Sequence, residues 1–310
     1  MRVLPRVLVA LLLALLLIAL VFTTIGAYYQ PNTRIPAGFL GQHVSVSGLP
    51  IRVYQLGQGP DVLLIHGSPG SLEDFGPIFA ALGARFRLTA FDRPGHGFSG
   101  DSGKYSPADN AAVADALLTQ LDLRDAIVVG HSYGGATALA LALRAPARAR
   151  AYVVLDSAAY EPLRPLPPLY EVLGVPYLGL GVASVLGAFI APTRIRGELK
   201  KIWHDAPDEF IRLRTRIWST PKVSHALARE TLDAAAALRA QSPHYPEITR
   251  PVSILAQAED PARKRTAERL HAAVAGSALK LLAHTGHYLQ FEQTDAVVHT
   301  IEQLAPESER

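Results

Sequence analysis

The order of apolar and polar residues predicts strands alternating with helices over most of the chain. Residues 43–46 and 51–54 alternate in polarity, as half-exposed strands do, whereas residues 62–65 are all apolar and predict a strand buried on both faces. Further strands are expected at 86–91, 126–129, 151–155, 252–256 and 279–282, and helices at 75–82, 108–121 and 136–143. This alternation indicates an α/β fold whose mostly parallel sheet is covered by helices on both faces.

One connection between predicted strands is far longer than a crossover needs. A single helix can join two parallel strands, so the segment from Asp156 to Pro251 predicts an inserted helical cap. Residues 172–192 of this segment carry no charge, and we interpret them as cap helices over an apolar pocket. The alternative is that this apolar segment contacts lipid. The basic residues that follow it indicate a solvated helix surface or, alternatively, attraction to anionic lipid headgroups. A membrane crossing is excluded because it would divide one parallel sheet between two sides of a membrane.

A second long apolar run lies near the N-terminus. Residues 7–27 are uncharged and long enough to cross the ~30 Å hydrocarbon core of a bilayer as a helix. Arg2 and Arg6 precede the run, which predicts a cytoplasmic N-terminus and a folded domain outside the cytoplasm. Secretion after cleavage of a signal peptide is the alternative. The apolar core of a signal peptide is usually about 7 to 15 residues long, so we expect an uncleaved, single-pass anchor in the cell membrane.

These patterns divide the chain into five parts. We expect an anchor at 1–27, a tether at 28–41, a first core segment at 42–157, a helical cap at 158–250 and a second core segment at 251–310. With 310 residues, of which 49% are hydrophobic, the chain can bury a large core.

Composition excludes several kinds of site. The net charge is only +3 and no long basic block is interleaved with aromatic residues, so nucleic acid is not an expected partner. The absence of cysteine excludes disulfides, thiolate catalysis and cysteine-based zinc sites. His284 lies three residues before His287, but no further ligand stands at a suitable spacing, so no metal site is expected.

A serine between glycines follows the predicted strand at 126–129. In the run Gly130-His131-Ser132-Tyr133-Gly134-Gly135, a glycine lies two residues away on each side of Ser132. A sharp turn from a strand into a helix requires small residues at these positions and exposes the serine oxygen to a base. Because a serine hydroxyl is otherwise a poor nucleophile, the pattern favours a catalytic serine over a chance pair of glycines in a loop.

The C-terminal part supplies a candidate base and a candidate acid. Asp260 comes shortly after the predicted strand at 252–256, and His287 follows the last predicted strand. The carboxyl ends of parallel strands meet at one edge of a sheet, where catalytic groups gather. A serine nucleophile needs a base that an acid orients, so Ser132, Asp260 and His287 form the expected triad.

Four segments, within roughly residues 42–305, together resemble the serine hydrolases of the α/β-hydrolase superfamily. They correspond to the loop after the third strand, an Asp-x-x-Gly-x-Gly-x-Ser loop, the nucleophile turn and the histidine loop. In this chain they read Ile65-His66-Gly67-Ser68-Pro69-Gly70, Phe91-Asp92-Arg93-Pro94-Gly95-His96-Gly97-Phe98-Ser99, Gly130 to Gly135, and Gly286-His287. The resemblance implies the superfamily's sheet, with a cap inserted after the sixth strand.

The resemblance also implies a role for each site residue. Ser132 would attack an acyl carbonyl, and His287 would accept its proton while Asp260 holds the imidazole. The backbone N–H groups of Ser68 and Tyr133 would form the oxyanion hole.

The identity of the acid has alternatives. Gln257 stands where the superfamily commonly has glycine before its acid, which leaves the neighbouring Glu259 open. Asp156 follows the sixth strand, where some relatives place the acid, and is the main alternative to Asp260.

The resemblance implies a cofactor-independent carboxylesterase or lipase-like enzyme. Its substrate would be an apolar small-molecule ester, cleaved through an acyl-enzyme intermediate. Serine at position 132 argues against epoxide hydrolase and haloalkane dehalogenase activity, because those relatives use a carboxylate nucleophile. Carbon–carbon bond hydrolysis and perhydrolase-type haloperoxidase chemistry are alternatives, as is a non-catalytic protein that binds an apolar ligand on the same fold.

Overall fold

In a computed structural model of the chain, the predicted sheet is present and mostly parallel. The structure describes residues 3–161, 168–203 and 205–306. These residues form one eight-stranded sheet with the order β1-β2-β4-β3-β5-β6-β7-β8, in which only the pairings of β2 with β1 and β4 are antiparallel. The strands are β1 (Gln42–Val46), β2 (Leu49–Leu56), β3 (Asp61–Ile65), β4 (Arg87–Phe91), β5 (Ala126–His131), β6 (Ala149–Leu155), β7 (Val252–Gln257) and β8 (Ala278–Leu282).

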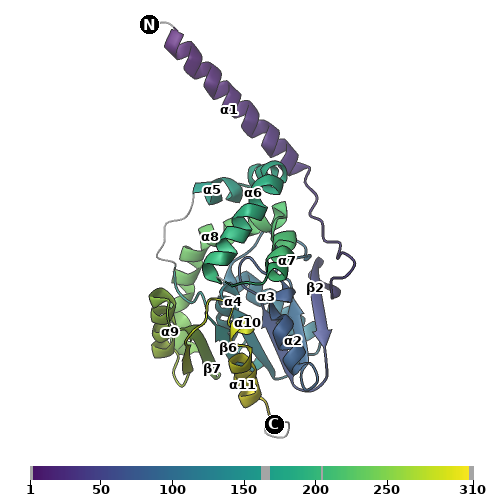
Figure 1. The fold of residues 1–310 in the computed structure, drawn as a ribbon, viewed down its shortest axis with the longest axis vertical. Helices are drawn as coiled ribbons and strands as arrows, with labels where there is room; N and C mark the ends of the chain where they lie inside the picture. Colours follow the sequence, from purple (N-terminus) through teal and green to yellow (C-terminus); the bar gives the residue numbers. More distant parts are fainter. Residues whose placement is uncertain (1–2, 162–167, 204, 307–310) are drawn as a thin grey trace.

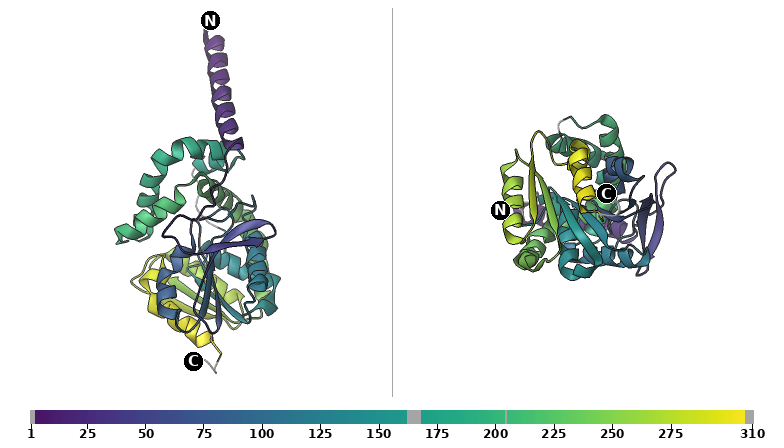
Figure 2. Two further views of the ribbon diagram at one scale, coloured as in Figure 1. Left: turned by 90° about the vertical axis from the view of Figure 1, so that its right-hand side faces the viewer. Right: turned by 90° about the horizontal axis from the view of Figure 1, so that it is seen from below.

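Helices cover both faces of this sheet (Figure 2). Side chains alternate between the two faces of β3, so that Leu63 and Ile65 belong to the core beneath α3, α4 and α9, and Val62 and Leu64 belong to the core beneath α2 and α11. The helices are α2 (Gly76–Leu82), α3 (Pro107–Gln120), α4 (Tyr133–Arg144), α9 (Pro261–Ala273), α10 (Leu289–Glu292) and α11 (Thr294–Leu304). Short 3₁₀ helices occupy Leu72–Phe75, Pro146–Arg148 and Ser242–Glu247. The predicted α/β fold class is therefore confirmed.

In the described part of the long connection between β6 and β7, four α-helices lie over one end of the sheet (Figure 1). They are α5 (Pro168–Gly174), α6 (Leu178–Ile202), α7 (Asp208–Trp218) and α8 (Pro221–Gln241). The helix α7 reaches the core through the buried ion pair of Arg214 with Asp74, whose atoms Nη2 and Oδ1 are 2.8 Å apart. We call α5 to α8 the cap helices; the exact domain boundaries given above stay a prediction.

The N-terminal helix α1 (Val3–Ala27) projects away from the sheet (Figure 1). Within its residues 5–27, an 18-residue window has a mean hydropathy of 3.0, and α6 is the other described helix that is long and apolar enough to cross a membrane. Near its C-terminal end, α1 contacts the start of α6. A Cβ atom added to Gly26 would lie 1.7 Å from the carbonyl oxygen of Tyr177, so the two backbones approach each other directly.

Candidate active site

Ser132 occupies a strained turn between β5 and α4. It has a φ of 53° and a ψ of −116°, a backbone conformation that residues other than glycine rarely adopt. The turn is held by the neighbouring strand, because the Ser132 N–H donates a hydrogen bond to the carbonyl oxygen of Leu155 over 2.9 Å. The strand β5 ends directly before Ser132, so the serine lies at the carboxyl edge of the sheet.

The two glycines around Ser132 are required by space. A Cβ atom on Gly130 would lie 2.2 Å from the carbonyl oxygen of Gly134, and one on Gly134 would lie 2.1 Å from that of Ile65. Both contacts are with backbone, which cannot move aside as a flexible side chain can. The turn therefore excludes any other residue at these two positions.

His287 lies in the loop after β8 and contacts Asp156. The side chain of Asp156 is fully buried directly after β6, and its Oδ2 atom is 2.5 Å from Nδ1 of His287. Gln257 also donates a hydrogen bond to Oδ2 of Asp156 through its Nε2 atom, over 2.9 Å. A proton held on Nδ1 by this carboxylate leaves the lone pair of the imidazole on Nε2, where a general base needs it.

The charges of this pair are set by burial and by each other. Burial and the positive charge of Arg263 lower the pKa of His287 from its ordinary value of 6.5, and the hydrogen bond with Asp156 opposes this shift. Burial raises the pKa of Asp156, but the hydrogen bond and charge of His287, together with Arg263, outweigh it and lower the pKa to about 2. At neutral pH the site therefore holds a neutral imidazole against an ionised carboxylate.

The structure gives the imidazole contact to Asp156 and not to Asp260, the acid expected first from the sequence. Asp260 is the N-cap of α9: its Oδ1 atom accepts hydrogen bonds from the N–H groups of Ala262 and Arg263 over 2.8 and 3.2 Å. Glu259 instead accepts the N–H of His284 over 2.7 Å. An aspartate followed by proline is a common start of a helix, so Asp260-Pro261 carried a signal for the capping role.

The residues expected to supply the oxyanion donors belong to segments that lie next to the serine. Tyr133 is the first residue of α4, and the first N–H group of a helix has no acceptor within the helix. Ser68 follows Gly67, and a Cβ atom on Gly67 would lie only 3.0 Å from Cβ of Ser132. The backbone of both loops thus lies beside Ser132, although their role in binding an oxyanion stays a prediction.

His131 supports the histidine loop from within the core. Its ring lies 4.6 Å from that of His287, and its Nε2 atom is 2.9 Å from the His287 carbonyl oxygen. Burial, with the charge of His287, lowers the pKa of His131 well below 6.5. A neutral His131 can donate from Nε2 to this carbonyl, which helps to fix the loop that carries His287.

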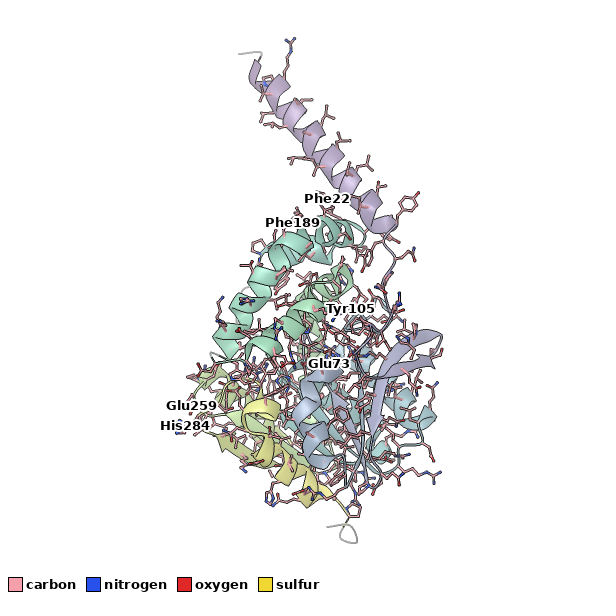
Figure 3. The ribbon with its side chains drawn as sticks, turned by 45° about the vertical axis from the view of Figure 1, so that its right-hand side comes forward. Phe22, Glu73, Tyr105, Phe189, Glu259 and His284 are labelled. Atoms are coloured by element: carbon pink, nitrogen blue, oxygen red, sulfur yellow. The ribbon has the colours of Figure 1, made fainter. Side chains whose placement is uncertain are left out.

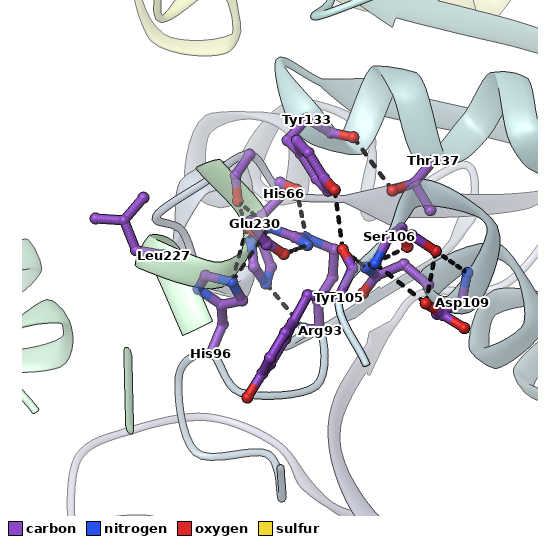
Figure 4. A network of polar contacts seen from close by, with 12 residues as sticks. His66, Arg93, His96, Tyr105, Ser106, Asp109, Tyr133, Thr137, Leu227 and Glu230 are labelled. Carbon is purple, nitrogen blue, oxygen red and sulfur yellow. Dashed lines mark hydrogen bonds and ion pairs between the residues drawn. The ribbon is translucent and has the colours of Figure 1, made fainter. Parts of the chain in front are cut away.

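A buried ion pair that the sequence did not reveal joins the cap to the loops beside Ser132. Arg93 pairs with Glu230 of α8, and its Nη2 atom also donates a hydrogen bond to the carbonyl oxygen of Gly67 over 2.7 Å. The guanidinium lies 5.1 Å from the centre of the Tyr133 ring. Figure 4 shows His66 and His96 in the same network, and Nε2 of His96 is 3.2 Å from Glu230 Oε2.

Nothing in the sequence around Glu230 distinguishes it from the other charges of α8, because its partner Arg93 lies far away in the chain. Burial raises the pKa of Glu230, but Arg93 and His96 lower it to about 2. The ionised carboxylate therefore compensates the buried charge of Arg93.

Glu292 braces the histidine loop from the other side. Its carboxylate accepts the N–H of Gly286 over 2.8 Å and that of Tyr288 over 3.2 Å. The N–H of His287 itself donates to the carbonyl oxygen of Ile202 at the end of α6, over 3.3 Å. The sequence reasoning missed Glu292 because a single glutamate after the motif gives no sign of these contacts.

Within the described ranges, no group of three or more histidine, aspartate and glutamate side chains could hold a metal ion. The candidate site contains a serine in a strained turn and a buried imidazole in contact with a carboxylate. This arrangement can support acyl transfer through a serine ester.

Comparison with known proteins gives one consistent result. Residues 62–300 match the model of the alpha/beta hydrolase family. The chain is 27% identical to 2-(acetamidomethylene)succinate hydrolase of Mesorhizobium japonicum, over 70% of this chain and 77% of that protein. It is 34% identical to the pimeloyl-[acyl-carrier protein] methyl ester esterase of Nitrosospira multiformis, over 34% of this chain and 41% of that protein.

A solved structure shows the same fold. The meta-cleavage product hydrolase of Pseudomonas fluorescens superposes with a TM-score of 0.71 and 23% sequence identity, over 86% of this chain and 97% of that one. At this identity the similarity supports the fold alone.

Proposed function

The chain belongs to the alpha/beta hydrolase family, and we propose that it is a serine hydrolase that cleaves small apolar esters. In this proposal Ser132, His287 and Asp156 form the catalytic triad. The observation that carries the proposal is the 2.5 Å contact of His287 Nδ1 with the buried Asp156 carboxylate. Asp156, the alternative acid from the sequence, replaces Asp260 in this proposal.

In the proposed reaction, Oγ of Ser132 attacks the ester carbonyl while Nε2 of His287 accepts the hydroxyl proton. The same proton passes to the leaving alkoxide, and an alcohol departs as the acyl-enzyme forms. Water, deprotonated by His287, then attacks the acyl-enzyme and releases a carboxylic acid and free Ser132. Asp156 fixes the imidazole tautomer and stabilises the imidazolium that forms in each step.

The backbone contributes the remaining stabilisation. The N–H groups of Ser68 and Tyr133 donate to the oxyanion of the tetrahedral intermediate, an interaction worth roughly 3 to 4 kcal/mol per donor. Because Ser132 is held in its turn before substrate arrives, little reorganisation is needed at the moment of attack.

The proposed location is the cell membrane. The helix α1 is apolar and its side chains are exposed along most of its length, which supports a single-pass anchor with the folded domain outside the cytoplasm. The test is mass spectrometry of the protein from washed membranes. Peptides that include residues 7–27 support the anchor, whereas a mature chain starting near residue 28 would show cleavage of a signal peptide.

A fluorophosphonate probe tests the nucleophile. We expect wild type to be labelled, Ser132→Ala not to be labelled, and the exposed-loop variant Ser102→Ala to be labelled like wild type. Circular dichroism of each variant checks folding. Failure of folded wild type to react would remove the basis for a serine mechanism.

The bond that is cleaved requires a separate measurement. We expect hydrolysis of p-nitrophenyl esters, followed over a series of acyl-chain lengths with and without detergent micelles, and its loss in Ser132→Ala. The pimeloyl methyl ester esterase relative supports ester cleavage. A labelled enzyme that turns over only a carbon–carbon substrate of the meta-cleavage type, and no ester, would replace the ester proposal with that reaction.

A further inference from the structure

Large apolar side chains are exposed together on the cap. Among the described residues after position 41, the exposed large hydrophobic side chains lie between residues 172 and 202. Leu56 is the one exception in this part of the chain. Phe189 is 81% exposed and Tyr177 is 55% exposed. The others in this segment are Val172, Val175, Val185, Leu186, Ile190 and Ile202. A cluster of exposed apolar side chains is typical of a surface that contacts a membrane or another protein.

This apolar surface adjoins the base of α1. A Cβ atom on Gly181 of α6 would lie 1.8 Å from the carbonyl oxygen of Phe22, so the two helices are in backbone contact at that point. Figure 3 shows Phe22 and Phe189 at the same end of the molecule, where α1 meets α6. If α1 spans a membrane, the surface of that membrane therefore lies beside the cap helix α6.

The charges of α6 are segregated along its length. No charged residue occurs at 172–192, and the second half of the helix then carries four exposed basic side chains. These are Arg194, Arg196, Lys200 and Lys201. One acid, Glu198, lies among them and pairs with Lys201 over 2.7 Å. An apolar surface followed by basic residues suits the boundary between acyl chains and anionic headgroups.

The far end of α6 rules out a second membrane crossing. The carbonyl oxygen of Ile202 accepts the N–H of His287, so this end of the helix is part of the histidine loop's environment. Trp203, the next residue, lies with its ring 6.3 Å from that of Tyr288. The helix thus has one end at the membrane anchor and the other at the candidate active site.

We propose that the apolar surface of residues 172–190 lies in the headgroup region of an anionic membrane, beside the inserted α1. The proposal rests on the membrane anchor proposed above and adds a second contact, made by the cap itself. In this placement the basic residues of α6 begin where the apolar surface leaves the anionic headgroups, and the candidate active site lies at the end of α6 that is farther from the bilayer. An apolar ester dissolved in that bilayer is then the substrate class that reaches the site most directly.

Single-cysteine labelling of the full chain tests the contact, since the chain has no cysteine of its own. A fluorophore is attached to Phe189→Cys, to Leu13→Cys in α1, or to Leu56→Cys as the matched exposed apolar control. Leu56 ends β2 and pairs with Leu88 near the start of β4, away from the carboxyl ends of the parallel strands. Each protein is placed in phosphatidylcholine–phosphatidylglycerol vesicles with its folded domain outside, and circular dichroism confirms folding.

Three quenchers then report the surroundings of the labels. We expect the label at 189 to lose most of its emission to a nitroxide on the lipid headgroup and little to iodide in water. The label at 56 should show the reverse, and the label at 13 should be quenched by a nitroxide deep in the acyl chains.

The remaining outcomes separate this proposal from the anchor. If iodide quenches the label at 189 as strongly as the label at 56 while the label at 13 stays in lipid, the anchor holds and the cap contact is overturned. If neither iodide nor the headgroup nitroxide quenches the label at 189, a second copy of the chain covers this surface and the proposal is wrong. If the label at 13 is not in lipid, both the anchor and the cap contact fail.

Discussion

At the scale of single residues, two aspartates that follow neighbouring strands have different surroundings. Asp156 has a φ of 44° and lies fully buried beside His287, whereas Asp260 is partly exposed and caps α9. Position along the sequence does not separate them, because both follow the carboxyl end of a strand.

Substitution by asparagine distinguishes the two aspartates. Asparagine tolerates a positive φ and caps a helix about as well as aspartate, so both variants should fold. We expect Asp156→Asn to lower kcat about ten-thousand-fold, because it removes the carboxylate that fixes the imidazole tautomer. Asp260→Asn should retain wild-type kcat within a few fold. Ester hydrolysis measures both, and the opposite ranking would restore Asp260 as the acid.

The candidate nucleophile and base could be predicted from sequence because local chemistry marks them. Ser132 is marked by glycines that no other residue can replace, and His287 by its position after the last strand. Asp156 also follows a strand, but so does Asp260, and Glu230 and Glu292 carry no local mark at all. Their contacts depend on partners in other loops, which only folding brings within hydrogen-bond distance.

At the scale of elements, α6 connects two regions that the sequence treats separately. It contacts α1 through Gly181 and ends at Ile202, whose carbonyl oxygen accepts the N–H of His287. From the sequence, the uncharged segment at 172–192 is expected to form helices over an apolar pocket. The structure leaves several of its large side chains exposed, which favours the lipid contact that was the alternative.

Two glycines of α6 provide a matched pair for testing its contact with α1. A Cβ atom at Gly181 would clash with the backbone of Phe22, whereas one at Gly187 would meet nothing within 4 Å. We expect Gly181→Ala to lower the midpoint of thermal unfolding in detergent micelles. Gly187→Ala should leave it unchanged or raise it, since alanine in a helix is favoured over glycine by about 1 kcal/mol. Equal changes in the two variants would show that α1 does not pack on α6 in this way.

The helix α8 contacts the core through the buried ion pair of Glu230 with Arg93. Glu230→Ala would leave Arg93 buried without its carboxylate, so we expect a loss of about 3–5 kcal/mol in the free energy of unfolding. Asp233→Ala is the control on the same helix. Its pair with Arg229 is partly exposed, and its loss should cost about 0–1 kcal/mol. Urea unfolding measures both, and similar losses would indicate that Arg93 finds another partner.

At the scale of the whole molecule, buried histidines predict how stability depends on pH. Burial lowers the pKa values of His66 and His131 well below 6.5, and burial also lowers the pKa of His96. Below about pH 6.5 these histidines bind protons in the unfolded chain but stay neutral in the folded protein. The free energy of unfolding therefore falls as the pH falls. Asp74 acts in the opposite direction, since burial raises its pKa to about 6 and protonation then favours the fold.

Burial raises the pKa values of Asp92 and Glu292 as well, and it lowers that of His287. Four such histidines outnumber these three carboxyls, so we expect the midpoint of thermal unfolding to decrease from pH 7.5 to pH 5. Each strongly shifted group changes the free energy of unfolding by about 1.4 kcal/mol per pH unit. His131→Gln should make the decrease smaller, whereas His299→Gln on the exposed side of α11 should not alter it. Calorimetry at several pH values checks this, and a midpoint that stays constant in wild type would contradict it.

Local patterns in the sequence predict the alternation of strands and helices, the serine turn, the inserted segment and the apolar N-terminal helix. These features depend on local periodicity, on glycines at fixed spacing and on apolar length, which neighbouring residues express directly. The tertiary structure decided which carboxylate meets His287, how α8 neutralises Arg93 and where α6 lies relative to α1. Each of these is a contact between residues far apart in the chain, and only the fold determines which distant groups meet.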